Sequence, residues 1–443
     1  MTPELSSSSA GGGSETRAGA TRALVLHPEI KSQYRPRDPA LALAEAMALA
    51  QALPGLELVD GLVVRLPKAL PGLLFGTGKV EELRLLIEAA GIELVLIDGP
   101  VTPVQQRNLE RAWKVKLLDR TGLILEIFAD RARTREGVLQ VELAALSYQR
   151  TRLVRAWTHL ERQRGGLGFV GGPGETQIEA DRRAIDMQMV RLRRQLSKTV
   201  RTRELHRAAR RKVPFPVVAL VGYTNAGKST LFNRLTGADV MAKDMLFATL
   251  DPTMRAVCLP TGKDVILSDT VGFISDLPTQ LIAAFRATLE EVLEADLIVH
   301  VRDIAHPETE EQARNVRTIL VDLGVDETRA QIELWNKADL LEPEQQAGLA
   351  ERAAAHPDVF LTSAVTGQGL DALFAGMTAR LDDHRTQEEI HLPHAAGRAR
   401  AWLYAQGVVE HEQMQPEGSM LQVNWTDRQR QAFRALDGSG TSP

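Results

Sequence analysis

Residues able to bind phosphate and metal gather in one segment near the middle of the chain. An apolar stretch over 216–221 leads into a glycine-containing loop, and a helical pattern over 231–235 follows it. The glycines let backbone N–H groups wrap phosphate oxygens, and the helix N-terminus adds positive potential. Lys228 would neutralise phosphate charge, and the Ser229 hydroxyl would ligate Mg²⁺. The predicted phosphate-loop residues are Gly222, Tyr223, Thr224, Asn225, Ala226, Gly227, Lys228 and Ser229.

Three later segments, each at the end of an apolar strand pattern, extend this site. Asp269 would hold Mg²⁺ through water, and the Gly272 N–H would sense a γ-phosphate. Asp339 can accept both N1–H and the exocyclic amine of guanine, whereas adenine presents the opposite pattern at N1. The ordered set therefore selects GTP over ATP. The predicted contacts here are Asp269, Thr270, Val271, Gly272, Asn336, Lys337, Ala338, Asp339, Thr362, Ser363 and Ala364.

The position of these segments also predicts an α/β fold with parallel strands. In open α/β sheets, ligands bind outside the carboxyl ends of parallel strands, and all four segments follow such strand patterns.

Phe273 stands just after Gly272, where many GTPases carry a glutamine that orients the attacking water. A phenyl ring cannot hydrogen-bond water, so we expect slow intrinsic hydrolysis that accelerates when a partner orders the site.

Length and composition limit the setting of this site. A chain of 443 residues with 44% hydrophobic and 25% charged residues is expected to form two to four globular domains. No apolar run approaches the ~20 residues of a membrane helix, and the N-terminus lacks the apolar core of a signal peptide. We expect a soluble cytoplasmic protein without stable membrane insertion. A lone cysteine, Cys258, excludes an internal disulfide and a cysteine-based zinc site.

Charge and periodicity single out residues 131–212. This segment holds 20 Lys and Arg against 8 Asp and Glu, a net charge of +12, while the remainder carries −16. Such a charge excess is typical of an element that binds nucleic acid, but a solvated arginine-rich helix face would give the same count. Apolar residues recur at heptad spacing from Leu139 to Leu160 and from Ile178 to Leu196, with a glycine-rich stretch between.

The pattern predicts an antiparallel helical hairpin with a flexible tip and arms of ~25 residues. Arg162, Arg164 and Phe169 at the tip would contact RNA phosphates and stack on a base. Two ordinary amphipathic helices joined by a plain linker are the alternative. The predicted division is a disordered tail (1–20), an N-terminal α/β domain (21–130), the basic hairpin (131–213) with its tip (161–175), a P-loop nucleotide-binding core (214–385), a small C-terminal α+β domain (386–436) and a tail (437–443).

The ordered motifs GxxxxGKS, DxxG, NKxD and SA resemble those of translation-factor-related P-loop GTPases. Residues 246–253 resemble switch I of the Obg–HflX branch. By that resemblance Thr249 would close over the γ-phosphate and ligate Mg²⁺, and its neighbours would line the site: Phe247, Ala248, Leu250 and Asp251. Over residues 23–435 the chain is similar to the HflX family, although Gly171 stands where an arginine is expected. The matching segments are Leu74–Glu82, Pro103–Glu110, Asp119–Phe128, Arg131–Gly137, Leu139–Leu143 and Gly172–Gln177.

The resemblance implies a GTPase that docks on the large ribosomal subunit and its rRNA. It would place the hairpin tip near the peptidyl-transferase region and split or rescue stalled ribosomes. The implied catalytic residues are Lys228, Thr249, Gly272 and Asn225. Asn225 resembles the asparagine of K⁺-dependent relatives, and a turn residue tolerating unusual φ is the other interpretation.

We expect a monomer, located in the cytoplasm and partly at the ribosome or membrane surface. Two other functions stay open from the sequence. One is a ribosome-assembly or RNA-modification GTPase, which would leave assembled ribosomes intact. The other is a GTP-gated RNA-binding scaffold with vestigial turnover.

Overall fold

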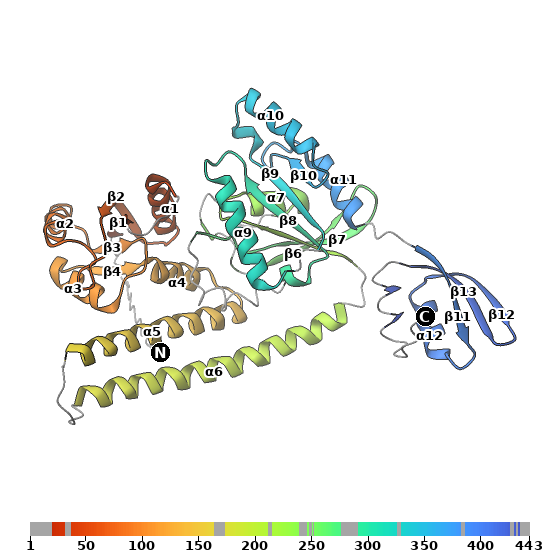
Figure 1. Ribbon diagram of the computed structural model, residues 1–443, viewed down its shortest axis with the longest axis horizontal. Helices are drawn as coiled ribbons and strands as arrows, with labels where there is room; N and C mark the ends of the chain where they lie inside the picture. The colour runs from red at the N-terminus through yellow and green to blue at the C-terminus, as the bar shows by residue number, and fades with distance from the viewer. Residues whose placement is uncertain are drawn as a thin grey trace, which may run out of the picture.

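The computed structural model contains two α/β units lying side by side, a long helical hairpin beneath them and a small C-terminal unit (Figure 1). The mixed α/β class predicted from the sequence is confirmed. For 153–163, 173–178 and 200–210 only the backbone is described. The structure describes residues 20–31, 37–163, 173–210, 215–238, 246–247, 250, 252–275, 291–325, 329–381, 386–425, 429–430 and 433–434.

The N-terminal unit is a parallel sheet with strand order β2-β1-β3-β4. Residues along β1 alternate between two cores: Ala23 and Val25 face one, and Leu24 and Leu26 face the other. Helices α1 and α4 cover the first face, and α2 and α3 cover the second. The elements are β1 (Thr21–Ile30), α1 (Pro39–Gln51), β2 (Leu56–Leu66), α2 (Thr77–Ala89), β3 (Leu94–Ile97), α3 (Pro103–Trp113), β4 (Lys116–Asp119) and α4 (Arg120–Arg131).

The hairpin consists of α5 (Arg135–Gln163) and α6 (Pro173–Arg210), which run side by side (Figure 1). Buried Met189 and Leu192 belong to the predicted apolar seam of α6. Arg150, which interrupts the seam of α5, pairs with Asp186 of α6 at 2.6 Å. The arms contain 29 and 38 residues, longer than the predicted ~25. In α6 the extra length arises because the arginine-rich run to Arg210 is helical, as the high helix propensity of arginine allows.

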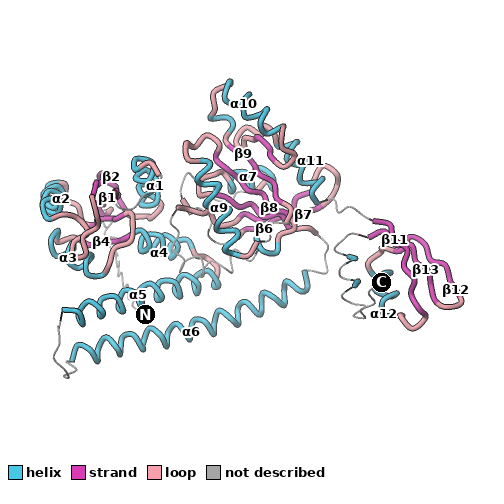
Figure 2. Tube along the Cα trace, viewed as in Figure 1, coloured by secondary structure: helices cyan, strands magenta, loops and turns pink. Residues whose placement is uncertain are grey.

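The second α/β unit contains a sheet of order β10-β9-β8-β5-β7-β6, parallel except for the β6–β7 pair. Helices pack on both faces of this sheet (Figure 2). The carboxyl ends of β5, β7, β9 and β10 therefore share one edge. The elements are β5 (Val217–Gly222), α7 (Lys228–Thr236), β6 (Thr253–Cys258), β7 (Asp264–Asp269), β8 (Leu297–Asp303), α9 (Thr309–Leu323), β9 (Gln331–Asn336), η1 (Ala338–Leu340), α10 (Pro343–Ala354), β10 (Val359–Leu361) and α11 (Leu370–Leu381).

One hydrophobic cluster is continuous across the two α/β units. It joins residues of α1 and α4 to Phe247, Leu250 and Phe273 of the second unit. At its centre the rings of Phe128 and Phe247 meet edge to face, with centroids 4.6 Å apart. The two units therefore share a core.

The C-terminal unit is an antiparallel sheet of order β11-β13-β12, with Leu403 of its helix packed on Leu421 and Val423. Its helix begins at Gly397, after a turn that joins Ala396 N–H to Pro393 C=O. The elements are β11 (Thr386–Pro393), α12 (Gly397–Ala405), β12 (Val409–Gln415) and β13 (Gly418–Trp425). Among the described helices, none is both long and apolar enough to cross a bilayer.

A buried histidine makes the stability of the second unit dependent on pH. His300 lies in β8 and is 5% exposed, and burial lowers its pKa to about 4 although Glu333 beside it opposes the shift. The folded state thus binds fewer protons than the unfolded state between pH 4 and 6.5, so stability falls as pH drops through this window. The contribution is on the order of 2–3 kcal/mol.

We predict that His300→Gln flattens the loss of stability between pH 6.5 and 4.5. Denaturant unfolding at several pH values measures it. His391→Gln, at an exposed position in β11, is the control and keeps the wild-type slope. An unchanged slope in His300→Gln would assign the pH dependence to other groups.

Candidate functional site

The phosphate loop between β5 and α7 depends on two glycines. Gly222 has φ +150°, and a Cβ there would lie 2.2 Å from the carbonyl oxygen of Val301. Gly227 has φ +93°, and a Cβ there would lie 2.2 Å from Nδ2 of Asn336. Any side chain at either position would collide with its neighbour, so the loop can pass close to β8 and β9 only with glycine.

Lys228 begins α7 and is buried. Its Nζ donates to the carbonyl oxygens of Tyr223 at 2.8 Å and Gly222 at 3.2 Å. Burial lowers its pKa to about 8, against the opposing influence of Asp269. A Cβ on Gly272 would lie 2.9 Å from this Nζ and 2.8 Å from Cα of Thr224. The glycine of the DxxG segment therefore lies directly on the phosphate loop.

The two described residues predicted to hold Mg²⁺ are adjacent. The Ser229 hydroxyl donates to Oδ2 of Asp269 at 2.6 Å, and Asp269 is fully buried at the end of β7. Hydroxyl and carboxylate oxygens are the hard ligands that Mg²⁺ takes, so the pair fits the ion. Within the described residues no group of three or more His, Cys, Asp or Glu could hold a metal. Thr249, to which the family resemblance assigns a third contact with the ion, lies outside the described residues.

The loops after β9 and β10 are braced to the phosphate loop by Asn336. This residue is 1% exposed; its Nδ2 donates to Ala226 C=O at 2.8 Å, and its Oδ1 accepts Ala364 N–H at 2.9 Å. Lys337 has φ +66° and pairs with Asp303 at 2.7 Å. Asp339 follows on η1 with an exposed side chain, which is the accessibility that recognition of a base requires.

Several other predicted residues, Asn225 among them, are exposed, lie in the core or lie outside the described residues. Asn225 is exposed with φ +59°, a left-handed conformation that asparagine tolerates. Phe247 and Leu250 were predicted as nucleotide contacts, but their side chains pack in the shared core, because large apolar groups gain more there than beside phosphates. Ala248, Thr249, Asp251, Arg164 and Phe169 lie outside the described residues, as does the side chain of Arg162.

Five predicted residues of the loops around the site are buried: Thr270, Val271, Ala338, Thr362 and Ser363. Thr270 Oγ1 donates to Leu220 C=O at 2.6 Å, and Ala338 N–H donates to Thr362 C=O at 3.1 Å. These contacts hold neighbouring strand ends together. The structure thus brings the described members of all four predicted segments to one sheet edge.

Sequence reasoning missed two polar contacts of this site. Asp303, the partner of Lys337, ends β8, and a carboxylate at the end of a strand pattern was a usable signal. The phenol of Tyr223 contacts Glu45 of α1, 178 positions away in the chain. No local pattern could indicate a contact over that separation.

We predict that Asp339→Asn weakens GTP binding about a hundredfold, because the amide cannot accept both guanine donors. Binding of xanthosine triphosphate should increase in compensation. Fluorescence titration with both nucleotides measures the two affinities. Asp371→Asn, an exposed carboxylate in the first turn of α11, is the control and should bind GTP normally. Unchanged GTP affinity in Asp339→Asn would exclude Asp339 as the base-reading residue.

Comparison with known proteins identifies the family. Four family models match successive parts of the chain: "GTP-binding GTPase N-terminal" (41–129), "GTP-binding GTPase Middle Region" (131–210), "50S ribosome-binding GTPase" (217–337) and "HflX C-terminal domain" (348–442).

Individual relatives match over most of their length. GTPase HflX of Magnetococcus marinus is 49% identical, covering 89% of this chain and 90% of the relative. GTPase HflX of Escherichia coli is 46% identical, covering 80% and 82%. A crystal structure of a GTP-binding protein from Sulfolobus solfataricus with GDP aligns at a TM-score of 0.44 and 23% identity, covering 81% of this chain and 98% of that one. The extent and identity of the sequence matches show that the chain belongs to the HflX family of GTPases.

Proposed function

We propose that this GTPase binds the large ribosomal subunit through its helical hairpin and uses the GTP cycle to split or rescue stalled ribosomes. Hydrolysis of GTP to GDP and phosphate is the activity of its family, and its central unit matches a family of 50S ribosome-binding GTPases. The more specific proposal of ribosome splitting comes from the resemblance of the sequence motifs to those of the HflX family. We further propose that the protein acts in the cytoplasm as a monomer that contacts rRNA.

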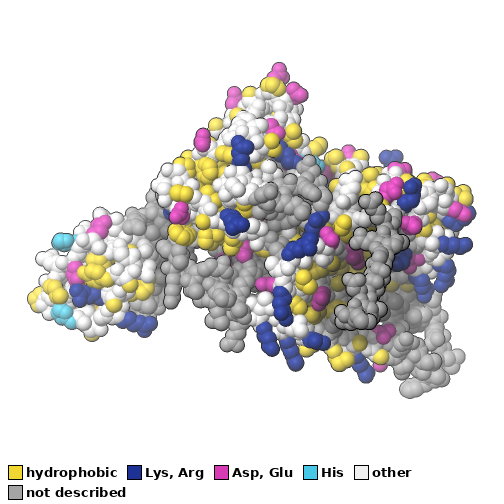
Figure 3. Space-filling model, turned by 180° about the vertical axis from the view of Figure 1, so that it is seen from behind, with side chains coloured by type: hydrophobic (Ala, Val, Ile, Leu, Met, Phe, Trp, Pro, Cys, Tyr) yellow, Lys and Arg dark blue, Asp and Glu magenta, His cyan; other side chains and the backbone are white. Residues whose placement is uncertain are grey.

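The observation that carries the proposal is the exposed basic surface of α6. Between residues 179 and 199, where side chains are described, α6 turns its apolar seam toward α5 and exposes basic residues to solvent. Seen from behind, Lys and Arg side chains line the lower edge of the molecule, where α6 runs (Figure 3). The exposed basic residues are Arg182, Arg183, Arg191, Arg193, Arg194 and Lys198.

This basic face suits a nucleic-acid backbone. Phosphate contacts dominate such binding and make it dependent on salt, because each neutralised phosphate releases counterions. The rest of the chain carries a net negative charge and would repel a nucleic-acid backbone. The charge distribution therefore favours approach of RNA along the hairpin.

The environment of Phe273 supports stimulation by a partner. Its side chain is 1% exposed and packs in the shared core, while its backbone is bonded to the phosphate loop. It cannot orient a water molecule for attack on the γ-phosphate. We therefore propose that the ribosome supplies the ordering that raises a slow intrinsic rate.

The test measures GTP turnover with and without purified large subunits, and the same mixtures with intact ribosomes are sedimented on sucrose gradients. We predict strong stimulation and conversion of intact ribosomes to subunits. Stimulation by immature subunits alone would indicate an assembly factor instead. Absence of both stimulation and co-sedimentation would contradict ribosome binding, and co-sedimentation without any turnover would indicate a scaffold.

Replacing Arg191 and Arg194 by Gln should weaken large-subunit binding about tenfold at 0.1 M salt and reduce its salt dependence by about two counterions. Nucleotide binding should be unchanged. Arg65 and Arg314, exposed on other units, are replaced by Gln as the matched control. The tip residues Arg162 and Arg164 give a second test pair. If nucleotide binding is lost along with ribosome binding, the hairpin is a structural element.

We also propose that Asn225 ligates K⁺ beside the phosphates. Exchange of K⁺ for Na⁺ should then slow hydrolysis about tenfold, because the cation supplies charge at the developing transition state. Asn225→Gly keeps the left-handed backbone but removes the amide oxygen, so this variant should hydrolyse GTP at one rate in both salts. Equal rates in both salts for the unmodified protein would leave Asn225 as a turn residue.

A further inference from the structure

A residue of the N-terminal unit reaches the segment that follows the DxxG glycine. We propose that Arg120, in the first turn of α4, is a positioning residue for GTP hydrolysis. It acts by holding Ser275, three residues after Gly272, against the phosphate loop. The proposal concerns the hydrolysis reaction itself and does not depend on ribosome binding.

The guanidinium of Arg120 makes directed contacts across the boundary between the two α/β units. Arg120 is 6% exposed, and its Nη2 donates to the Ser275 carbonyl at 2.8 Å. Its Nη1 donates to Oδ1 of Asp98 at 2.6 Å, and Nη2 also pairs with Glu45 of α1. Two carboxylates of the N-terminal unit thus fix the orientation of the group that holds Ser275. The forked geometry of arginine makes this arrangement possible, whereas a lysine could not reach all three partners.

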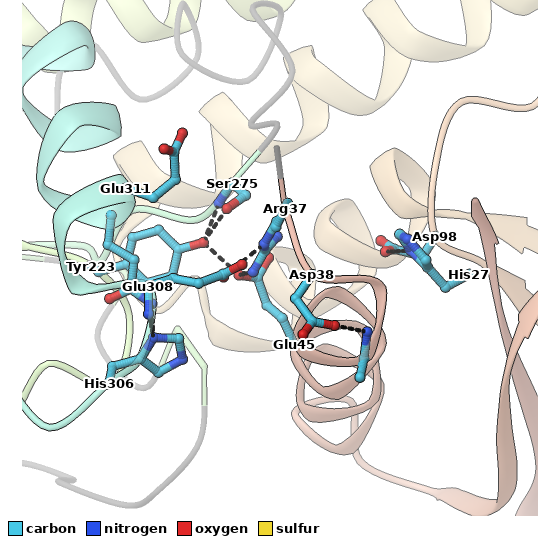
Figure 4. A network of polar contacts seen from close by, with 12 residues as sticks. His27, Arg37, Asp38, Glu45, Asp98, Tyr223, Ser275, His306, Glu308 and Glu311 are labelled. Carbon is cyan, nitrogen blue, oxygen red and sulfur yellow. Dashed lines mark hydrogen bonds and ion pairs between the residues drawn. The ribbon is translucent and has the colours of Figure 1, made fainter. Parts of the chain in front are cut away.

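The phenol of Tyr223 holds the same residue from the phosphate loop. Its hydroxyl accepts Ser275 N–H at 2.6 Å and lies 2.6 Å from Ser275 Oγ. It donates to Oε2 of Glu45 at 2.5 Å (Figure 4). A hydroxyl has one proton to donate and two lone pairs, so these three contacts use its full capacity when Ser275 Oγ donates to it. Ser275 is therefore held at its N–H, its side chain and its carbonyl.

Glu45 is the common anchor of both contacts. It accepts from Tyr223 and Arg120, and Arg37 donates to it at 2.7 Å while also bonding Glu308 at 2.9 Å. Burial opposes ionisation of the carboxyl, but Arg120 and Arg37 outweigh it and lower the pKa of Glu45. The carboxylate is thus charged and fully engaged at the boundary between the units.

The fixed position of Ser275 extends to the reacting end of the nucleotide site. Phe273 N–H donates to Gly222 C=O at 3.1 Å, and Thr224 N–H donates to Phe273 C=O at 2.7 Å. Gly272 precedes this pair and lies against Lys228. The segment from Gly272 to Ser275 is therefore held by the phosphate loop near its start and by Arg120 at its end.

This geometry predicts an effect on rate more than on binding. The Gly272 N–H must meet a γ-phosphate oxygen, and a displacement of about 1 Å at such a contact costs up to about a hundredfold in rate. GDP lacks the γ-phosphate, so its affinity depends little on this segment. Arg120 shares α4 with Phe128, whose ring contacts Phe247 of the segment that resembles switch I. One helix thus touches both the segment after Gly272 and the segment that resembles switch I.

The test uses the full chain without ribosomes and compares Tyr223→Phe, Glu45→Gln and the combined variant. Tyr223→Phe keeps the ring in the core and removes the hydroxyl alone. We expect kcat to fall about tenfold in steady-state GTP hydrolysis, with KM and GDP affinity within about twofold of the unmodified protein. The combined variant should be no slower than the slower single variant, because both substitutions break the same contact. Arg120→Lys should show the same loss of kcat.

Tyr148→Phe is the matched control. The Tyr148 hydroxyl donates to Oδ1 of Asp119 at 2.6 Å, which is the same tyrosine–carboxylate chemistry between α5 and the N-terminal unit. In both tyrosines burial raises the pKa. This control should hydrolyse GTP at the unmodified rate. The proposal is overturned if Tyr223→Phe and Glu45→Gln keep kcat while lowering the melting temperature, or if Tyr148→Phe slows hydrolysis equally.

Discussion

The hydrophobic cluster shared by the two α/β units is the interaction on which the remaining geometry depends. It places α1 and α4 of the N-terminal unit against the segments on either side of the nucleotide site. Full burial of a phenylalanine such as Phe247 stabilises this contact by about 2–3 kcal/mol. Apolar burial has no direction, so the cluster holds the two units together without fixing their register. Directed polar contacts within it must do that.

The charged network around Glu45 supplies that direction. Burying ions costs several kcal/mol each, so such a network adds little net stability even when every group is paired. Its value lies in the penalty for any other arrangement, since breaking one partner leaves a buried charge at a cost of about 3–5 kcal/mol. Three contacts of this network cross between the units and together define their relative position: Tyr223 with Glu45, Arg120 with Ser275 and Arg37 with Glu308.

Helix α4 joins the basic hairpin to the boundary between the two α/β units. Asp119 caps α4 through Gly122 N–H at 2.8 Å and also accepts from Tyr148 and Arg152 of α5. Arg120 is the next residue along the chain. The base of the hairpin and the residue that holds Ser275 therefore meet at the start of α4.

The sequence by itself determined the local parts of this protein. Strand–loop–helix order and glycine spacing indicated the phosphate loop, the apolar strands placed Asp269, Asn336 and Asp339 at their ends, and heptad spacing indicated the hairpin. These signals are readable because backbone geometry and side-chain periodicity act over a few residues. The placement of the two units was decided only by tertiary structure. Phe247 with Phe128, and Tyr223 with Glu45, meet across more than a hundred positions, and their contacts depend on packing that no local pattern encodes.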